Sequence, residues 1–202
     1  MQLFLDALHK DTKTMWYVFF RVLAFTGMRK GEALALTWRD INLTDKSITI
    51  NKTVSRNTKG QLIITTPKTR NSNRIIQIDD NTLRSLQQWR TEQARYLIGL
   101  GYRAMQGEQL IFANLTNNSI INTVYPTLLL KRVCQKHQLK EIKVHGFRHT
   151  HCSLLFEAGV PMKDVKERLG HADIKTTMNI YTHVTQNSKE QSAQLFANYV
   201  NF

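Results

Sequence analysis

The chain has 202 residues, 42% of them hydrophobic, so it is long enough to bury one sizeable core or two small ones. Its 28 lysines and arginines against 15 aspartates and glutamates give a formal net charge of +13, which favours a polyanionic partner such as nucleic acid. The lack of any run of about 18 apolar residues excludes a membrane-spanning helix, and the isolated cysteines Cys134 and Cys152 exclude a cysteine-based zinc site.

The first third of the sequence changes from helical to strand periodicity. Residues 12–26 form an apolar run that predicts a buried helix ending at Gly27, and residues 29–36 predict a second, short helix. Three later segments alternate with a period of two: residues 47–54, 61–65 and 74–78. The turn signals N-T-K-G and P-K-T-R-N-S-N separate these segments. We therefore predict a three-stranded antiparallel meander with Lys68 in its second turn.

Helical periodicity returns in the rest of the chain. We predict helices over residues 81–99, 120–138, 145–158, 162–169, 174–181 and 188–200. Pro126 has to lie in a first turn or kink its helix, and a short strand is expected over residues 110–112. With no repeat or linker in view, the sequence predicts one mainly α domain of the α+β class with a small three-stranded antiparallel sheet.

The segment from His145 to His183 carries the residue types that phosphate chemistry needs. His145 and Arg148 stand three residues apart in H-G-F-R-H-T-H and share a face if the segment is helical. A guanidinium offers a planar fork of donors to phosphate oxygens, and a histidine donates a hydrogen bond or takes up a proton. His171 follows a Leu-Gly pair, and ten residues later Tyr181 supplies a hydroxyl that can attack phosphorus. Together these residues predict the breaking and rejoining of a phosphodiester.

Two further groups of charged residues fit a phosphate site. Arg29 stands at a predicted helix start, where the helix dipole disfavours it unless an anion is bound there, and Glu32 is placed to orient it. Lys68 lies in the turn T-P-K-T-R-N-S-N-R between two strands. Arg70 and Arg74 flank it, so this turn is suited to following a sugar–phosphate backbone and placing an ammonium near a leaving oxygen.

Each of these features also has a simpler interpretation. A basic surface turn, a solvated Arg–Glu pair and a half-buried tyrosine need no function. His145 and His149 also have the i, i+4 spacing of a zinc site, with His151 nearby. This cluster contains no acidic residue, however, and Arg148 would place a fixed positive charge beside the metal.

Five motifs in this order resemble the catalytic domain of the tyrosine recombinases, the phage-integrase family. They are T-G-M-R-K-G-E-A-L-A-L-T-W at 26–38, T-P-K-T-R-N-S-N-R at 66–74, H-G-F-R-H-T at 145–150, L-G-H at 169–171 and I-Y-T-H at 180–183. The resemblance covers nearly the whole chain and is closest to integrases of Gram-positive phages and conjugative transposons. It implies a helical catalytic domain and a site-specific DNA recombinase that needs neither a metal ion nor ATP.

The resemblance implies a role for each residue of the phosphate clamp. Arg29 and Arg148 would bind the scissile phosphate and stabilise the charge of its transition state. His171 would donate a further hydrogen bond to the same phosphate. Glu32 would support the clamp.

The resemblance also assigns the proton transfers and the nucleophile. Tyr181 would attack phosphorus, leaving a 3′-phosphotyrosine and a free 5′-hydroxyl. Lys68 would protonate the leaving 5′-oxygen, and His145 would act as acid or base toward the tyrosine. Arg70 and Arg74 would contact the DNA backbone.

The implied partner is double-stranded DNA at attachment sites, bound by a homotetramer, with a directionality factor for excision. We expect a cytoplasmic, nucleoid-associated protein of a bacterial host without membrane contact, since Asp6 interrupts any signal peptide. Because the first motif begins at residue 26, we expect residues 1–202 to be a catalytic domain without the core-binding and arm-binding domains of such integrases. A type IB topoisomerase-like enzyme and a non-catalytic DNA-binding module remain alternatives.

Overall fold

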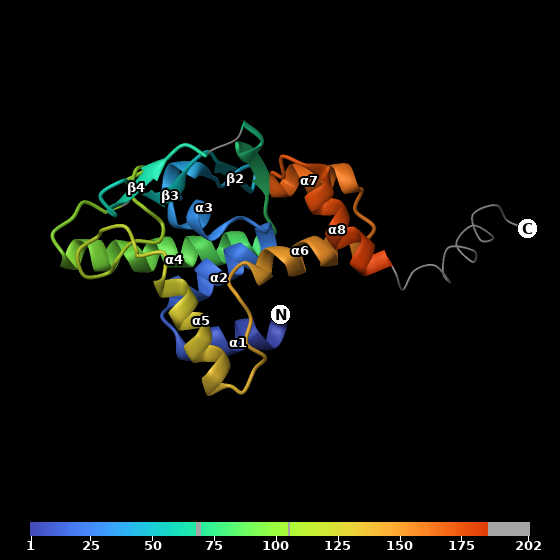
Figure 1. Ribbon diagram of the computed structural model, residues 1–202. Coiled ribbons are helices and arrows are strands. Elements are labelled where there is room, and N and C mark those ends of the chain that lie inside the picture. Colours follow the sequence, from blue (N-terminus) through green and yellow to red (C-terminus); the bar gives the residue numbers. More distant parts are fainter. Residues whose placement is uncertain (68–69, 105, 186–202) are drawn as a thin grey trace, which may run out of the picture.

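A buried helix, α2 (Thr14–Thr26), lies at the centre of the fold in the computed structural model, which describes residues 1–67, 70–104 and 106–185 (Figure 1). Most of its side chains are buried, and it contacts α1 (Gln2–Asp11), α4 (Asp80–Gly99) and α6 (Gly146–Glu157). Such an apolar sequence has to be covered on nearly every side. The predicted helix over residues 12–26 is thereby confirmed.

The strands form two small antiparallel sheets. In one sheet, β2 (Ser47–Ile50) lies between β1 (Ile41–Asn42) and β5 (Arg74–Gln77). The other is the hairpin of β3 (Thr53–Arg56) and β4 (Leu62–Thr65). A mainly helical α+β fold with a three-stranded antiparallel sheet is confirmed.

The predicted meander is wrong in its connections. The run 47–54 is not one strand, because β2 ends at Ile50 and the next strand pairs with a different partner. The side chain of Lys52 leaves the alternating pattern: its Nζ lies 2.8 Å from Asp40 Oδ2 and 2.9 Å from Thr37 Oγ1. Asp40, the buried carboxylate, lies outside the alternating run 47–54, so the alternation within that run could not show that the strand ends at Ile50.

Four further helices occupy predicted segments: α3 (Lys30–Leu34), α5 (Tyr125–Lys136), α7 (Met162–Leu169) and α8 (Ile174–Thr185). The bounds of α7 are the predicted ones, and the others differ at one or both ends. The 3-10 turns η1 (Trp38–Asp40) and η2 (Arg70–Ser72) were not predicted as helices. Pro126 lies in the first turn of α5, which is one of the two placements expected for it. In place of the strand predicted over residues 110–112, Leu110 alone makes an isolated bridge, with Thr37, and α1 was not predicted. The predicted helix over residues 188–200 lies outside the described residues.

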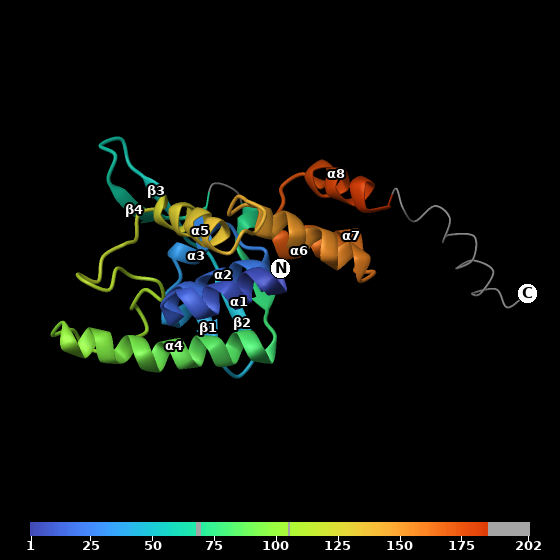
Figure 2. The same ribbon diagram turned by 90° about the horizontal axis from the view of Figure 1, so that it is seen from below.

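The last three helices of the described chain form a separate small core at one end of the molecule (Figures 1 and 2). Cys152 and Phe156 of α6 pack there with Val165 and Leu169 of α7. The connection to the main core runs through Phe147, whose ring lies 5.5 Å from that of Phe20. None of the helices within the described ranges is long and apolar enough to cross a membrane.

Candidate active site

Four of the predicted catalytic side chains line one pocket of about 350 Å³. They are Arg29, His145, Arg148 and His171, and the same pocket is also lined by His149, Ala172, Asp173 and Ile180. The four come from the start of α3, the start of α6 and the connection between α7 and α8. The pocket therefore lies where the main core meets the small core of the last three helices.

The start of α3 presents Arg29 to the pocket. Gly27 ends α2 in the left-handed conformation (φ 65°), and Arg29 is the N-cap of the next helix. Glu32 accepts from the backbone N–H of Arg29 at 2.8 Å and from its Nη1 at 2.8 Å. One carboxylate thus holds both the main chain and the guanidinium, while the Arg29 side chain remains 40% exposed.

Arg148 is the buried member of the pocket, with 3% of its surface exposed. Its Nη1 donates to Gly27 O at 2.8 Å and its Nη2 to Leu169 O at 2.6 Å. Burial, together with the positive charges of Arg29 and Arg74, lowers the pKa of Arg148 to about 9. A bound anion would relieve both effects, so this guanidinium is suited to a phosphate.

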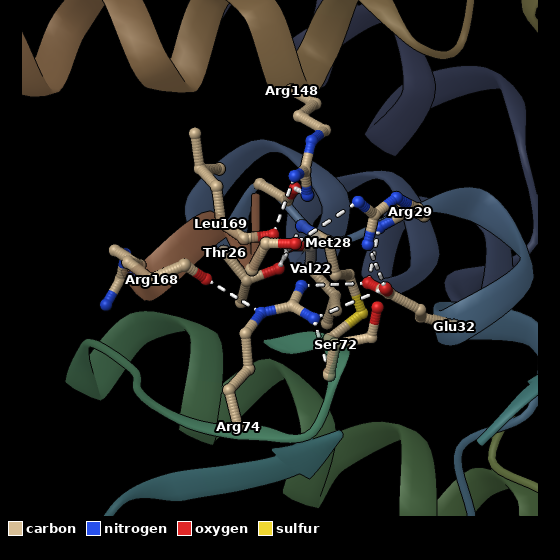
Figure 3. Close-up of polar contacts among 12 residues, drawn as sticks. Val22, Thr26, Met28, Arg29, Glu32, Ser72, Arg74, Arg148, Arg168 and Leu169 are labelled. Atoms are coloured by element: carbon tan, nitrogen blue, oxygen red, sulfur yellow. Dashed lines mark hydrogen bonds and ion pairs between the residues drawn. The ribbon is translucent and has the colours of Figure 1, made fainter. Parts of the chain in front are cut away.

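Three arginines donate to three consecutive carbonyls at the end of α7 (Figure 3). Arg148 reaches them from α6, and Arg74 reaches them from β5. The distances are 2.8 Å from Arg74 Nε to Arg168 O, 2.6 Å from Arg148 Nη2 to Leu169 O and 3.3 Å from Arg29 Nη2 to Gly170 O. These carbonyls form the negative end of the helix dipole. The arginines therefore fix the chain immediately before His171.

Arg74 lies inside the molecule, with its side chain 6% exposed. Its Nη2 donates to Glu32 Oε2 at 2.8 Å, and Glu32 is 2% exposed. Burial alone would raise the pKa of Glu32, but Arg74 and Arg29 bring it below its ordinary value. This position does not favour the predicted DNA contact of Arg74. It supports the interpretation of Glu32 as the residue that holds the clamp together.

The two pocket histidines differ in their surroundings. His171 is 8% exposed, and its Nδ1 lies 2.8 Å from Thr177 Oγ1. Burial, followed by the charges of Arg148 and Arg29, lowers the pKa of His171 to about 4, so the ring is neutral near pH 7. His145 is the N-cap of α6 and is partly exposed; partial desolvation of its ring, followed by the charges of His149, Arg148 and Arg29, lowers its pKa as well.

The third histidine of the H-G-F-R-H-T-H segment points elsewhere. His151 Nδ1 lies 3.0 Å from Ala24 O, and Arg168 Nε donates to its Nε2 at 3.1 Å. His145 and His149 instead contact one another at the pocket, with ring centroids 4.8 Å apart. His151 therefore does not join the pair of histidines that the zinc alternative considered. Within the described part of the chain no group of three or more potential metal-ligating side chains is found.

The family model described as the phage integrase family matches residues 1–188. The chain belongs to the phage integrase family.

Relatives in this family include integrases of a bacterium and of a phage. The chain is 33% identical over 190 residues to the ICEBs1 integrase of Bacillus subtilis, covering 94% of this chain and 50% of that protein. It is 34% identical over 185 residues to the integrase of Staphylococcus phage L54a, covering 86% and 49%. The chain thus spans about half the length of the curated relatives it matches.

Solved structures of related recombinases share the fold. The Tn1549 transposon integrase in complex with circular intermediate DNA matches with a TM-score of 0.80 at 24% identity, covering 97% of this chain and 64% of that one. XerA recombinase matches with a TM-score of 0.69 at 22% identity, covering 96% and 61%.

Among the described residues of this phage-integrase-family chain, the predicted nucleophile Tyr181 is not in the pocket lining. Tyr181 lies on α8, 39% exposed, with its ring 5.0 Å from that of Phe156. Its neighbour Ile180 lines the pocket instead. Lys68 lies outside the described residues, and of Arg70 the structure describes the backbone only, at the start of η2.

Four residues whose structural roles were not predicted from the sequence contact the pocket residues or the helices that carry them. They are Arg74 in its buried role, His151, Arg168 and Thr177. A signal was available for Arg74: in the alternating strand β5 it shares a face with Ile76, which is buried, while Ile75 is 65% exposed. For the others no local signal exists, because their burial depends on contacts between separate helices.

Proposed function

We propose that this chain is the catalytic domain of a site-specific DNA recombinase that integrates and excises a mobile element. The observation that carries the proposal is the convergence of Arg29, His145, Arg148 and His171 on one pocket. Three separate segments of the family's motifs meet there. They bring together two guanidiniums and the imidazoles of His145 and His171, beside a third imidazole, His149, and one carboxylate in the lining, Asp173. This donor set is suited to a phosphodiester.

The arginines bind and polarise the scissile phosphate. Arg148 is rigid because two carbonyls hold it, whereas Arg29 is oriented by Glu32 and stays accessible to the DNA backbone. Hydrogen bonds from fixed, poorly hydrated donors stabilise the extra negative charge of the pentacoordinate transition state. Neutral His171 adds one more donor.

The proposed reaction exchanges one phosphoester bond for another. The phenol oxygen of Tyr181 attacks phosphorus, and the bond from phosphorus to the 5′-oxygen breaks. His145 takes up the phenol proton, and Lys68 delivers a proton to the leaving 5′-oxygen. The number of phosphoester bonds is unchanged, so the 5′-hydroxyl of another strand reverses the step without ATP.

This mechanism requires Tyr181 to leave its contact with Phe156 and turn toward the pocket. The two residues lie on different helices, α8 and α6, so a movement of α8 relative to α6 would change this contact. Ile180, next to Tyr181 in the chain, already contributes to the pocket lining. We propose that DNA binding brings this movement about.

The proposed partner is double-stranded DNA at attachment sites, with a homotetramer as the active assembly and a directionality factor for excision. The net charge of +13 supports a nucleic acid partner. The Tn1549 integrase, which shares the fold, was solved in complex with DNA.

Covalent capture tests the proposed function. The full-length protein that contains this chain is incubated with a nicked attachment-site duplex from the end of its own element, and the products are separated under denaturing conditions. We expect a protein–DNA adduct whose DNA-bearing peptide contains Tyr181. Y181F should give no adduct, whereas Y102F, which alters an exposed tyrosine in another part of the molecule, should give as much as wild type.

Two results would overturn the proposal. One is the absence of any adduct from the folded full-length protein on its own element's ends. The other is an adduct that persists in Y181F. Relaxation of supercoiled plasmid without any attachment site would instead point to a topoisomerase.

A further inference from the structure

The ring of His171 has one nitrogen engaged inside the protein and one left for the pocket. Its Nδ1 lies 2.8 Å from the hydroxyl of Thr177, and both side chains are buried. The opposite nitrogen, Nε2, belongs to a ring that lines the pocket. Whether Nε2 carries the proton of the neutral ring therefore depends on the hydrogen bond that Thr177 makes with Nδ1.

A phosphate in the pocket offers only acceptors. Nε2 must then carry a proton in order to hydrogen-bond to it. A neutral imidazole has a single N–H, so Nδ1 must at the same time be an acceptor. Burial and the charges of Arg148 and Arg29 keep this ring neutral near pH 7, so its two nitrogens do not both carry a proton.

The hydroxyl of Thr177 meets this requirement. It is fully buried on α8, and within the described residues its one hydrogen-bond partner is His171 Nδ1. If Nδ1 carried the proton, the hydroxyl hydrogen of Thr177 would have no acceptor in that part of the chain. Buried donors without an acceptor are rare because they are costly. The arrangement with Thr177 as donor and Nδ1 as acceptor satisfies both groups.

We propose that Thr177 is a positioning residue that fixes His171 in the tautomer with the proton on Nε2, directed at the bound phosphate. This inference rests on the proposed function for its catalytic meaning. The assignment of the tautomer itself concerns the protein without DNA. Because α8 also carries Tyr181, Thr177 ties the helix of the nucleophile to a phosphate-binding side chain.

Nitrogen NMR of isotope-labelled histidine side chains tests the tautomer directly in the 202-residue chain near pH 7. The His171 signals are assigned from their loss in H171Q. We expect a protonated, pyrrole-type Nε2 and a pyridine-type Nδ1 in wild type and in T177S. In T177V, which keeps the shape of the side chain and removes the hydroxyl, we expect this preference to be lost.

Cleavage kinetics test the consequence for catalysis. Single-turnover adduct formation by the full-length protein should be slowed about tenfold by T177V, the usual effect of losing one hydrogen bond, and largely restored in T177S. T91V is the matched control, since Thr91 is an exposed threonine of α4 whose hydroxyl donates to Gln87 O of the same helix. It should change neither the histidine spectrum nor the rate.

The outcomes separate this inference from the proposed function. A wild-type His171 with the proton on Nδ1 overturns the inference, whatever the enzyme does. An unchanged histidine spectrum in folded T177V also overturns it. If T177V does not fold, the wild-type and T177S spectra decide. An Nε2–H tautomer in a protein that never forms an adduct supports the tautomer assignment and counts against the proposed function alone.

Discussion

Replacing Glu32 by glutamine should destabilise the protein strongly, although the two side chains have the same shape. The carboxylate is 2% exposed and lies 2.8 Å from Arg74 Nη2 and 2.8 Å from Arg29 Nη1. E32Q leaves the 6%-exposed guanidinium of Arg74 without its counter-charge. Breaking a buried ion pair on one side costs about 3–5 kcal/mol, and we expect a loss of this size in the free energy of unfolding.

Urea denaturation followed by tryptophan fluorescence near pH 7 measures this loss. E157Q is the matched control, because Glu157 is exposed on α6 and should change the free energy of unfolding by less than about 0.5 kcal/mol. The double variant E32Q/R74Q removes both charges and should be more stable than the sum of the single changes predicts. A free energy of unfolding for E32Q within about 1 kcal/mol of wild type would refute the reasoning.

The pH dependence of the Glu32 contribution follows from the sign of its shift. The pKa of the folded-state carboxyl is below the ordinary value of 4.5, because Arg74 and Arg29 outweigh the effect of burial. A group with a lowered folded pKa stabilises the protein above its unfolded pKa, and this contribution is lost as the pH falls through the folded pKa. The difference between wild type and E32Q should therefore shrink below about pH 4.5.

Three further changes test other parts of the site. R148K keeps the charge but loses the fork that reaches two carbonyls, and single-turnover cleavage should fall about 100-fold. G27A should lower the free energy of unfolding by more than about 1 kcal/mol, because φ is 65° and a Cβ would lie 2.6 Å from Leu169 Cδ2. His151 and His171 have pKa values of about 4 against 6.5 when unfolded, so each should lower the stability as the pH falls from 6.5 toward 4, by about 1.4 kcal/mol per pH unit.

Each of these expectations has its own contradicting result. Wild-type cleavage rates in R148K would mean that the bidentate contacts of Arg148 do not matter. Wild-type stability in G27A would mean that the chain accommodates a Cβ beside Leu169. An H151Q variant that loses stability between pH 6.5 and 4 as steeply as wild type would show that His151 is not the group that titrates.

The helices were predictable because their signals are local. The apolar run of α2 ends at Gly27, and α7 ends at Gly170, both with left-handed backbone that favours glycine. The sheet was not predictable in the same way. β2 pairs with β5, although the β3–β4 hairpin lies between them in the sequence. Alternation within a strand does not show which other strand it pairs with.

The sequence pointed to the residues that line the pocket and missed the buried contacts that hold them in place. Arg29, Arg148 and His171 were found because their motifs and chemistry are visible along the sequence, and they line one pocket. The buried role of Arg74 was missed because an arginine in a basic turn is usually solvated. Only the fold brings its guanidinium to Glu32 and to the end of α7.

The charge balance of the interior explains why these arginines and the end of α7 belong together. Arg29, Arg74 and Arg148 bring three positive charges to one place, and Glu32 supplies one negative charge. The carbonyls at the end of α7 contribute the partial negative charge of a helix C-terminus, which reduces the repulsion without adding a second carboxylate. The arrangement therefore leaves a net positive charge among these arginines and Glu32, which suits the phosphate of the proposed DNA substrate.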